Sequence, residues 1–520
     1  MSPSFRFLLP LLLVACCVSA RAEPAALERG AAITDPGALR ELDRDRFGLA
    51  RILTPERSGD TPLSDSELFA LPAMAPVRSA VDAEFDRYIS AHKTELPNQS
   101  IGVGDTFDFQ LFDRAQLYSD HSRFVLSGII NRMDRAYVSP DACGETRLIY
   151  RLIPTDVAQA SDSLASPRLP MTLNVVLKAK GDHAGDHAAG QGITCAEIAR
   201  RWLTAGDLPQ SGAALAEQLI AKDGPLDLIE PADVFRLETN IQIAHVTKSP
   251  ARDFRTDYLL KVFDYNSQTK AFEEAPLENQ IDRARIMADD KLRREFKAWL
   301  LEPEHFAEFD RGTVLIPEKF LAIGAVAVTP VGFGVSKLQP EFGLTEGDDS
   351  TSKPLFSDGD VVVALKQAAA RGMPTQNIRS VAGFERRLND ITCSGCHQTR
   401  GIGGFHFPGV DWLAPKPDNA TIVPGSPHFF GDQPRRRDIL AAISDGKTPD
   451  YSRGFSTRPQ TRASAELAGS EYGDGWGAHC YAPDRSDNDR SFTPWTCAKG
   501  LTCEVVDKTS RMGMCFVKTR

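Results

Sequence analysis

The chain has 520 residues, of which 42% are hydrophobic and 25% are charged, and its formal net charge is −10 at pH 7. This composition is typical of a globular protein that can build a sizeable core, and the length predicts two or three domains. The acidic balance argues against a nucleic-acid partner, because nucleic-acid-binding proteins present a basic surface.

The first 22 residues are typical of a signal peptide for export. Arg6 precedes an apolar run, residues 7–18, that is too short to span a bilayer as a helix. Residues 20–22, Ala-Arg-Ala, supply the small side chains that a signal peptidase reads, so we expect cleavage after Ala22. We therefore expect a periplasmic or secreted protein with no transmembrane segment later in the chain.

Residues 13–16, Leu-Val-Ala-Cys, support a different processing route, because they resemble a bacterial lipobox with a lipid anchor at Cys16. Cysteine parity helps to weigh the two routes. Cleavage after Ala22 leaves eight cysteines, whereas the lipobox route leaves Cys17 unpaired, which is a liability in an oxidising compartment. We therefore favour the soluble exported form over a membrane-anchored lipoprotein.

Residues 23–343 are predicted to form an α+β domain, because strand-like and helical patterns occur there without the regular alternation of a doubly wound sheet. One helix is expected at 80–92 and another at 196–203. Strand-like runs rich in Val, Ile, Leu and Tyr lie at 123–134, 146–154, 171–180, 241–248, 257–266 and 271–277, the last two as a hairpin. Residues 282–304 show the strongest helical periodicity, with Pro303 ending the helix, and 312–330 is again β-like.

Residues 344–360 are polar and rich in turn-forming residues, which predicts a linker. Residues 361–470 are predicted to be a mainly α-helical and loop-rich segment, in which helices at 361–372 and 380–390 lead the chain to Cys393. The basic run at 435–437 precedes an apolar-periodic stretch, which indicates the solvated start of a helix. Its functional alternative is a docking patch for an acidic partner or for haem propionates.

The motif Cys393-Ser-Gly-Cys396-His397 has the spacing of a haem c attachment site. Two cysteines three residues apart can reach both vinyl groups of one porphyrin, and the adjacent imidazole can bind the iron. At these residues, and at the glycine-rich stretch 401–404 that follows, the sequence resembles the c-type cytochromes. The resemblance implies one covalent haem c held by Cys393 and Cys396, with His397 as the proximal axial ligand.

Two other interpretations of this motif stay open, a zinc site and a structural disulfide between Cys393 and Cys396, whereas a thioredoxin-like redox pair is disfavoured. A zinc ion would need two further ligands, which His406 and His428 could supply. A thioredoxin-like redox pair would need a strand before the cysteines, and the preceding residues are instead charged and helical. The prediction of haem c is favoured because covalent haem attachment takes place outside the bacterial cytoplasm, where the signal peptide directs the chain.

His406 is the candidate for the distal axial ligand. Nine residues separate it from His397, and extended backbone covers roughly 3.3 Å per residue, so the chain can pass round the ring edge to the other face. His428 and Met373 are competing ligands, and a methionine would raise the reduction potential. The plainer alternative is that His406 is a polar residue in a packed loop.

The remaining cysteines predict disulfides in an exported protein. We expect Cys143 to pair with Cys195, the alternative being two buried thiols. The final segment, residues 471–520, has little to fill a core, so we expect a small module held together by disulfides. Its four cysteines can pair in three ways, between which the spacing does not choose: Cys480, Cys497, Cys503 and Cys515.

The expected activity is one-electron transfer at the haem iron, with an unidentified protein as redox partner. One alternative is a haem-dependent oxidoreductase, peroxidase- or oxygenase-like, with a substrate pocket in the N-terminal domain. The other alternative is a non-catalytic surface or binding protein whose haem or zinc is structural. A single C-x-x-C-H motif argues against a dihaem peroxidase, and His183 with His187 lie in a glycine-containing stretch that indicates a solvated loop.

Overall fold

The computed structural model describes most of the chain between residues 32 and 453 and parts of the C-terminal segment. The described ranges are 32–57, 61–104, 106–139, 141–156, 169–181, 193–246, 255–329, 356–373, 375–393, 427–453, 479–481, 496, 501–504 and 512–517. The expected signal peptide, the lipobox and most of the expected linker lie outside these ranges.

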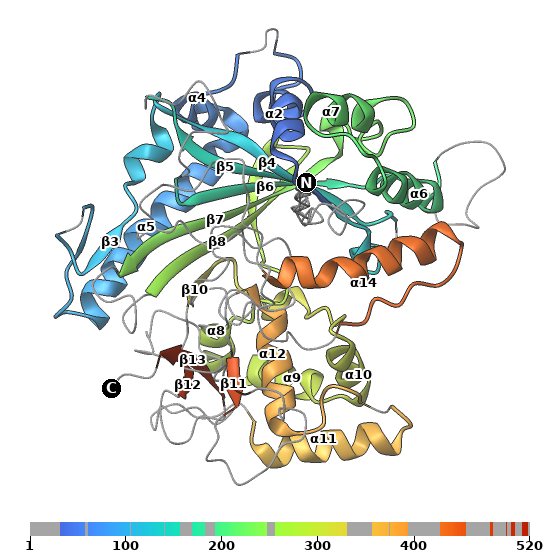
Figure 1. The fold of residues 1–520 in the computed structure, drawn as a ribbon. Helices are drawn as coiled ribbons and strands as arrows, with labels where there is room; N and C mark the ends of the chain where they lie inside the picture. Colours follow the sequence, from blue (N-terminus) through green and yellow to red (C-terminus); the bar gives the residue numbers. More distant parts are fainter. Residues whose placement is uncertain are drawn as a thin grey trace, which may run out of the picture.

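The largest element in the described residues is a ten-stranded sheet (Figure 1), in which every strand pair is antiparallel except β2 with β3. The order runs β1-β4-β5-β6-β7; β7 also pairs with β3 and β8, and β8 pairs with β9 and β10. The strands are β1 (Ala32–Ile33), β2 (Ile101–Gly102), β3 (Phe109–Leu111), β4 (Ser122–Arg132), β5 (Glu145–Pro154), β6 (Met171–Lys178), β7 (Val234–Val246), β8 (Arg255–Asn266), β9 (Ala271–Ala275) and β10 (Ala325–Thr329).

Alternate residues of the long strands point to opposite faces of this sheet. The first face is apolar and forms most of the main core, through Leu148, Tyr150, Leu173, Val175, Leu237, Ile241, Leu259 and Phe263. The intervening residues include charged side chains that we call the charged face, namely Glu145, Arg147, Arg236, Glu238 and Asp264. The same face also carries buried apolar side chains, among them Ile149, Val176 and Leu260, so it is mixed in character.

Helices cover the first face and complete the main core. They are α2 (Pro36–Arg44), α3 (Leu49–Leu53), α4 (Asp65–Ala70), α5 (Ala75–Glu95), α6 (Cys195–Gly206) and α7 (Gly212–Ile220). Their starts follow from local sequence. Asp35 caps α2 by accepting from the Ala38 backbone N–H at 2.8 Å, and Ser64 with Glu67 forms a capping box on α4.

A second group of helices packs around its own core of aromatic side chains. They are α8 (Arg283–Ala288), α9 (Asp290–Leu300), α10 (Pro303–Arg311), α11 (Asp358–Ala370) and α12 (Val381–Ile391). Phe306 of α10 stacks on Phe384 of α12 with ring centroids 4.9 Å apart. We call this group the helical bundle; it leads the chain directly to Cys393.

The prediction of one helix over residues 282–304 was wrong, because the chain forms α8 and α9 and then enters α10 at Pro303. The break lies at Asp289, whose carboxylate accepts from the backbone N–H groups of Lys291 at 2.8 Å and Leu292 at 3.1 Å. An aspartate that bonds the backbone in this way starts a new helix and does not continue the old one. The apolar periodicity of the sequence continues across Asp289, so the periodicity alone could not reveal the break.

Other expected elements agree with the structure. The helices expected at 80–92 and 196–203 lie within α5 and α6, and the five expected strands from 123 to 266 coincide with β4 to β8, although β7 begins seven residues earlier. Residues 271–275 form the expected hairpin with β8. The β-like stretch 312–330 yields only β10, preceded by a 3-10 turn, η5 (Glu318–Phe320).

Helix α14 (Pro427–Ser444) packs along α6 and against the short turn η3 (Met133–Arg135) (Figure 1). The expected solvated helix start at residues 435–437 was therefore wrong. Arg436 is 2% exposed, and Arg435 donates to Asp134 at 2.9 Å. Arginine can be buried in this way because its planar guanidinium pairs with carboxylates while its aliphatic stem packs.

The C-terminal segment contains a three-stranded sheet in the order β11-β13-β12, with β11 (His479–Tyr481), β12 (Leu501–Glu504) and β13 (Met512–Val517). Cys503 lies opposite Cys515 in the register of β12 and β13, Cys480 lies on β11, and Cys503 is disulfide-bonded. Cys497 lies outside the described residues.

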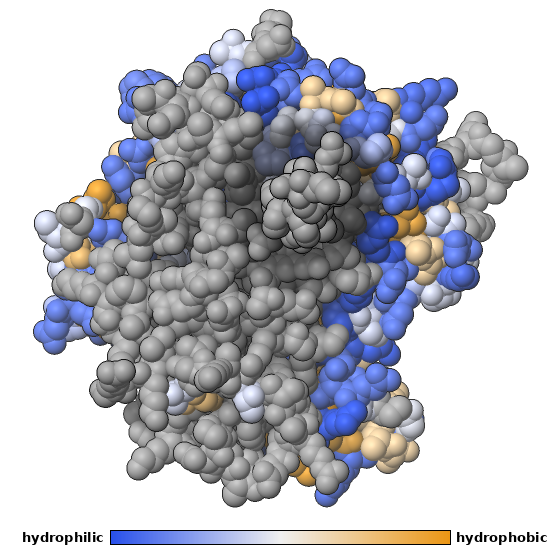
Figure 2. All heavy atoms as spheres, viewed as in Figure 1, coloured by the Kyte–Doolittle hydropathy of each residue, from blue (hydrophilic) through white to orange (hydrophobic). Residues whose placement is uncertain are grey.

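The described part of the surface is mostly hydrophilic along α6, α10 and α11 in the view of Figure 2. Among the helices in the described ranges, none has both the length and the apolar character that crossing a membrane requires.

The first testable prediction concerns His245 on β7, whose burial lowers its pKa to about 4. The unfolded chain has an ordinary histidine pKa of about 6.5, so on acidification the unfolded state binds a proton first and stability falls between about pH 6.5 and pH 4. From pH 7 to pH 5 we expect a loss of about 2 kcal/mol in urea unfolding, which His245→Gln should remove. The exposed His121→Gln should keep the wild-type slope; an unchanged slope in His245→Gln would contradict the assignment.

Candidate functional site

Cys393, the first cysteine of the motif, lies two residues after the end of α12. Its thiol donates to the backbone carbonyl of Glu278 with Sγ 3.6 Å from the oxygen. Its side chain also packs against a cluster that we call the apolar patch, made of Tyr258, Leu260, Val262, Ala275, Leu277, Ala325 and Ala327. The first cysteine of the motif is therefore held against the sheet at β8, β9 and β10.

Helix α12 is fixed in place by buried contacts with segments before and after it. Arg387, which is fully buried, donates to the backbone carbonyls of Asp310 and Arg453, both at 2.7 Å. Gly312 ends α10 at a positive φ of 72°, and a Cβ there would lie 2.9 Å from the Arg387 guanidinium. Glycine is needed at this position for the backbone conformation and for the close approach of the arginine.

The turn that carries Glu278 is held on both sides. Leu277 donates its backbone N–H to Ala322 at 2.9 Å, and Ala322 donates back to Gln280 at 2.8 Å. Between them Asn279 adopts a positive φ of 59°, which asparagine tolerates better than most residues. The Glu278 carbonyl is therefore presented to Cys393 from an ordered turn.

Asn279 also ties this turn to the segment after α10. Its amide donates to the Val314 carbonyl at 3.0 Å and its oxygen accepts from the Ile316 N–H at 2.8 Å. These bonds pair both the NH2 group and the oxygen of the buried Asn279 amide. Burying an amide without such partners would cost free energy.

The side chain of Glu278 is bound by Arg135, which lies at the end of η3. Arg135 donates from Nη1 to Glu278 Oε1 at 3.0 Å and from Nη2 to Oε2, and its Nε donates to Glu145 at 3.2 Å. Burial alone would raise the pKa of Glu278, but Arg135 more than offsets that effect and the pKa is lowered. A two-pronged arginine–carboxylate contact fixes both position and orientation.

The ion pairs continue across the charged face of the sheet. Arg147 donates to Glu145 and Glu238, each at 2.9 Å, and Arg236 donates to Asp264 at 2.6 Å. Burial raises the pKa of Glu145, but Arg135 and Arg147 outweigh it and hold the pKa well below its usual range. Of these pairs, Arg236 and Asp264 lie directly opposite each other on the neighbouring strands β7 and β8, where opposite charges stabilise a sheet. Arg147 reaches Glu238 across β6, which lies between β5 and β7.

Asp134 is the most strongly bound carboxylate of this region, with a side chain 1% exposed. It accepts from Arg132 on Oδ1 and from Arg435 and Arg453 on Oδ2, all at 2.9 Å. Arg435 and Arg453 are more than 300 residues away in sequence. This contact therefore joins the end of β4 to the segment that follows the C-x-x-C-H motif.

Two amide side chains of the same sheet have a buried oxygen. The side-chain oxygens of Asn174 on β6 and Asn240 on β7 accept no hydrogen bond from any of the residues that the structure describes. Both asparagines alternate with residues of the apolar first face, so they lie on the side of Glu238 and Arg236. Buried polar atoms of this kind are uncommon in a purely structural sheet.

The other predicted site residues are distributed as follows. Cys396, His397 and His406 lie outside the described residues, and His428 lies on α14. Met373, a candidate for the distal position in the sequence-based prediction, packs against the helical bundle core. In the ranges that the structure describes, no three His, Cys, Asp or Glu side chains converge so that they could hold a metal ion.

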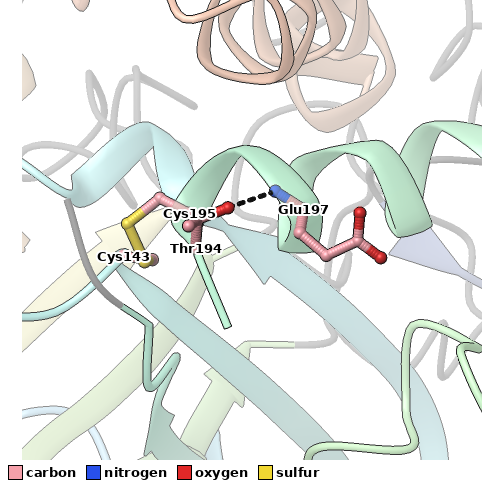
Figure 3. The surroundings of a disulfide bond; sticks show 4 residues. All are labelled: Cys143, Thr194, Cys195 and Glu197. Atoms are coloured by element: carbon pink, nitrogen blue, oxygen red, sulfur yellow. Dashed lines mark hydrogen bonds between the residues drawn. A yellow bond between two sulfur atoms is a disulfide. The ribbon is translucent and has the colours of Figure 1, made fainter. Parts of the chain in front are cut away.

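Cys143 and Cys195 form a disulfide, which is the pairing expected from the sequence (Figure 3). It joins the turn before β5 to the first residue of α6, with the two Cα atoms 5.3 Å apart. Beside it Thr194 caps α6 by accepting from the Glu197 N–H at 3.2 Å.

Sequence reasoning did not find Arg135, Glu278 or Asp134. One signal was available, since Glu145, Arg147 and Arg151 recur at even spacing in a strand that is otherwise apolar. Such a pattern predicts a polar sheet face, and buried arginines on that face need carboxylate partners. Which carboxylates they meet depends on the tertiary fold.

Comparison of the chain with protein-family models, with curated proteins and with solved structures gives no match.

Proposed function

We propose that the protein is an exported haem c protein that carries out one-electron transfer at a single covalently attached haem, with another protein as its redox partner. The observation that carries the proposal is the C-x-x-C-H motif at residues 393–397, behind an expected signal peptide. The surroundings of Cys393 support it, because the cysteine lies against the apolar patch, a surface suited to the edge of a flat apolar ring.

Each residue of the motif has its own role in this proposal. Cys393 and Cys396 would hold the ring through thioethers, and His397 would bind the iron. The bound haem supplies the one-electron redox couple. The structure brings Cys393 to the sheet at the end of α12, so attachment there would hold the haem between the helical bundle and β8 to β10.

Covalent haem is tested by producing the full chain in a host that matures c-type cytochromes. We expect the haem to stay with the denatured protein through acid–acetone extraction, and a haem mass on the peptide that contains Cys393 and Cys396. The double variant Cys393→Ala/Cys396→Ala should lose the haem, while Cys480→Ala should keep it. A colourless wild type that holds stoichiometric zinc would contradict the proposal and favour a structural metal site.

A haem-dependent oxidoreductase is the second candidate, and the buried oxygens of Asn174 and Asn240 favour it. Amide oxygens on a sheet face that have no donor among the described residues could accept from a polar substrate. The two candidates differ in the distal side of the iron, because an electron carrier has two strong axial ligands and an oxidoreductase keeps one position open. Added cyanide should therefore leave the ferric spectrum of an electron carrier unchanged.

We propose His406 as the distal ligand, and this gives a second testable prediction. His406→Ala should convert a low-spin ferric signal to high-spin in optical and EPR spectra, because the iron loses a strong-field ligand. The iron should also gain affinity for cyanide or peroxide. His428→Ala and Met373→Ala are the matched controls; a spin change in either of them, with none in His406→Ala, would move the assignment to that residue. A wild type that is already high-spin would favour the oxidoreductase.

A further inference from the structure

We infer that Arg135 and Glu278 position Cys393 for haem attachment, an inference that rests on the function proposed above. Arg135 is three residues beyond the end of β4 and does not contact the thiol. It binds the side chain of Glu278, whose backbone carbonyl accepts from the thiol of Cys393. It is therefore a positioning residue, which acts through Glu278.

The first step of the argument is the contact between Cys393 and the Glu278 carbonyl. A cysteine side chain has three staggered rotamers about its Cα–Cβ bond, and the Glu278 carbonyl, 3.6 Å from Sγ, favours the rotamer that points towards it. The apolar patch lies against the same side chain. The sulfur is therefore aimed in one direction while it remains a protonated thiol.

The second step is the link from Glu278 to Arg135. The backbone of the turn is bonded to Ala322, but the carboxylate of Glu278 reaches away to the guanidinium of Arg135 and is 29% exposed. Arg135 in turn is held by Glu145, and Gly144 packs beneath the η3 turn, where a Cβ would lie 2.7 Å from Met133 Cα. The two-pronged contact between Arg135 and Glu278, which we call the fork, thus connects the end of the β4–β5 pair to the turn that faces Cys393.

The third step is the chemistry that requires the thiol of Cys393 to be oriented. In thioether formation the S–H bond of Cys393 breaks, sulfur bonds to the inner carbon of a haem vinyl group, and the hydrogen ends on the outer carbon. Atoms and electrons balance within thiol and vinyl, so no further reactant is needed. Additions of this type depend steeply on how the reacting atoms are placed. A thiol that is free to rotate would leave its vinyl group unreacted more often.

The experiment compares Arg135→Gln with Arg236→Gln in the full chain, both produced with the c-type maturation system. Arg236 is the matched control, because it also forms a fork with a carboxylate, Asp264, on the charged face and contacts neither Glu278 nor Cys393. Glu278→Gln, which keeps the shape of the side chain, tests the other partner. Arg135→Lys keeps the charge without the fork and should restore attachment in part.

Two measurements report the result independently of any activity. Alkylation of the denatured protein, followed by peptide mapping, measures how much Cys393 still carries a thiol while Cys396 carries haem. The reduced pyridine haemochrome spectrum distinguishes haem with one thioether from haem with two, and Cys393→Ala provides the one-thioether reference. In Arg135→Gln and Glu278→Gln we expect the ratio of two-thioether to one-thioether protein to fall by roughly tenfold.

Each outcome has a distinct meaning. If Arg135→Gln and Glu278→Gln match the wild type with both thioethers formed, the positioning role is overturned while the proposed function stands. An equal fall in Arg236→Gln would also overturn it, because the effect would then come from general destabilisation. If the wild type itself carries no covalent haem, the proposed function fails first. A selective fall at Cys393 in the two variants, with partial recovery in Arg135→Lys, supports the inference.

Discussion

Replacing Asp134 with alanine is expected to destabilise the protein by about 3–5 kcal/mol, the cost of removing one partner from a buried group of ion pairs. The carboxylate accepts from Arg132, Arg435 and Arg453 at 2.9 Å each. Removing the carboxylate leaves the buried arginines without the negative charge that all three of them contact, which is why the expected loss is large. The free energy of unfolding from urea titration at pH 7 measures the loss.

Asp264→Ala is the matched control for this experiment. Asp264 also pairs with an arginine of the charged face, but its side chain is 49% exposed, so its loss should cost at most about 1 kcal/mol. A destabilisation of Asp134→Ala no larger than that of Asp264→Ala would show that Asp134 is not the centre of the network. Limited proteolysis should also cut α14 faster in Asp134→Ala, because the variant loses the contact to Arg435.

The same network predicts how stability changes in acid. Burial raises the pKa of Asp134, but Arg132, Arg436 and Arg453 outweigh it and hold the pKa well below the ordinary value. Because the folded-state pKa is the lower one, the stabilisation is fully present above the unfolded pKa of about 3.9 and is lost as the pH falls through the folded pKa. The pKa of Arg132 is lowered to about 9, mainly because the side chain is buried. Asp134 raises this pKa, but neighbouring arginines lower it further, so this region is rich in positive charge.

The sequence predicted the regular elements of this fold better than their contacts. The runs in β4 to β8 are apolar and β-branched, so their local pattern alone identified strands. The short strands β1, β2 and β3 carry no such pattern, because their two or three residues are strands only through pairing: β1 with β4, β3 with β7, and β2 with β3. The break at Asp289 was missed because a capping aspartate does not interrupt the apolar period of the helices on either side.

The candidate site also has a part that the sequence could predict and a part that it could not. The spacing of Cys393, Cys396 and His397 is local, so the sequence could predict a haem c site from it. The surroundings of Cys393 are not local: Glu278 is 115 residues away and Arg135 lies 143 residues further towards the N-terminus. Arg435 and Arg436 suggested a solvated helix start because a basic run usually has that meaning, and only the fold reveals Asp134 beneath them.

Removing both Cys143 and Cys195 is expected to lower the free energy of unfolding by about 4 kcal/mol, the chain-entropy value for a loop of this size. The bridge spans 52 residues and joins the turn before β5 to the start of α6. Its loss increases the conformational entropy of the unfolded chain and also releases the N-terminus of α6 from the turn before β5. Replacing both residues with alanine avoids a stray thiol that could pair with another cysteine.

Thr194→Ala separates the bridge from the helix cap beside it. This variant removes only the hydrogen bond to the Glu197 N–H and should cost about 1 kcal/mol. If Cys143→Ala/Cys195→Ala is no less stable than Thr194→Ala, the bridge contributes only to local structure. The covalent haem should stay in both variants, because Cys393 is held by the Glu278 turn and the helical bundle. Loss of haem in the double alanine variant alone would show that α6, through its packing against α14, also supports the attachment site.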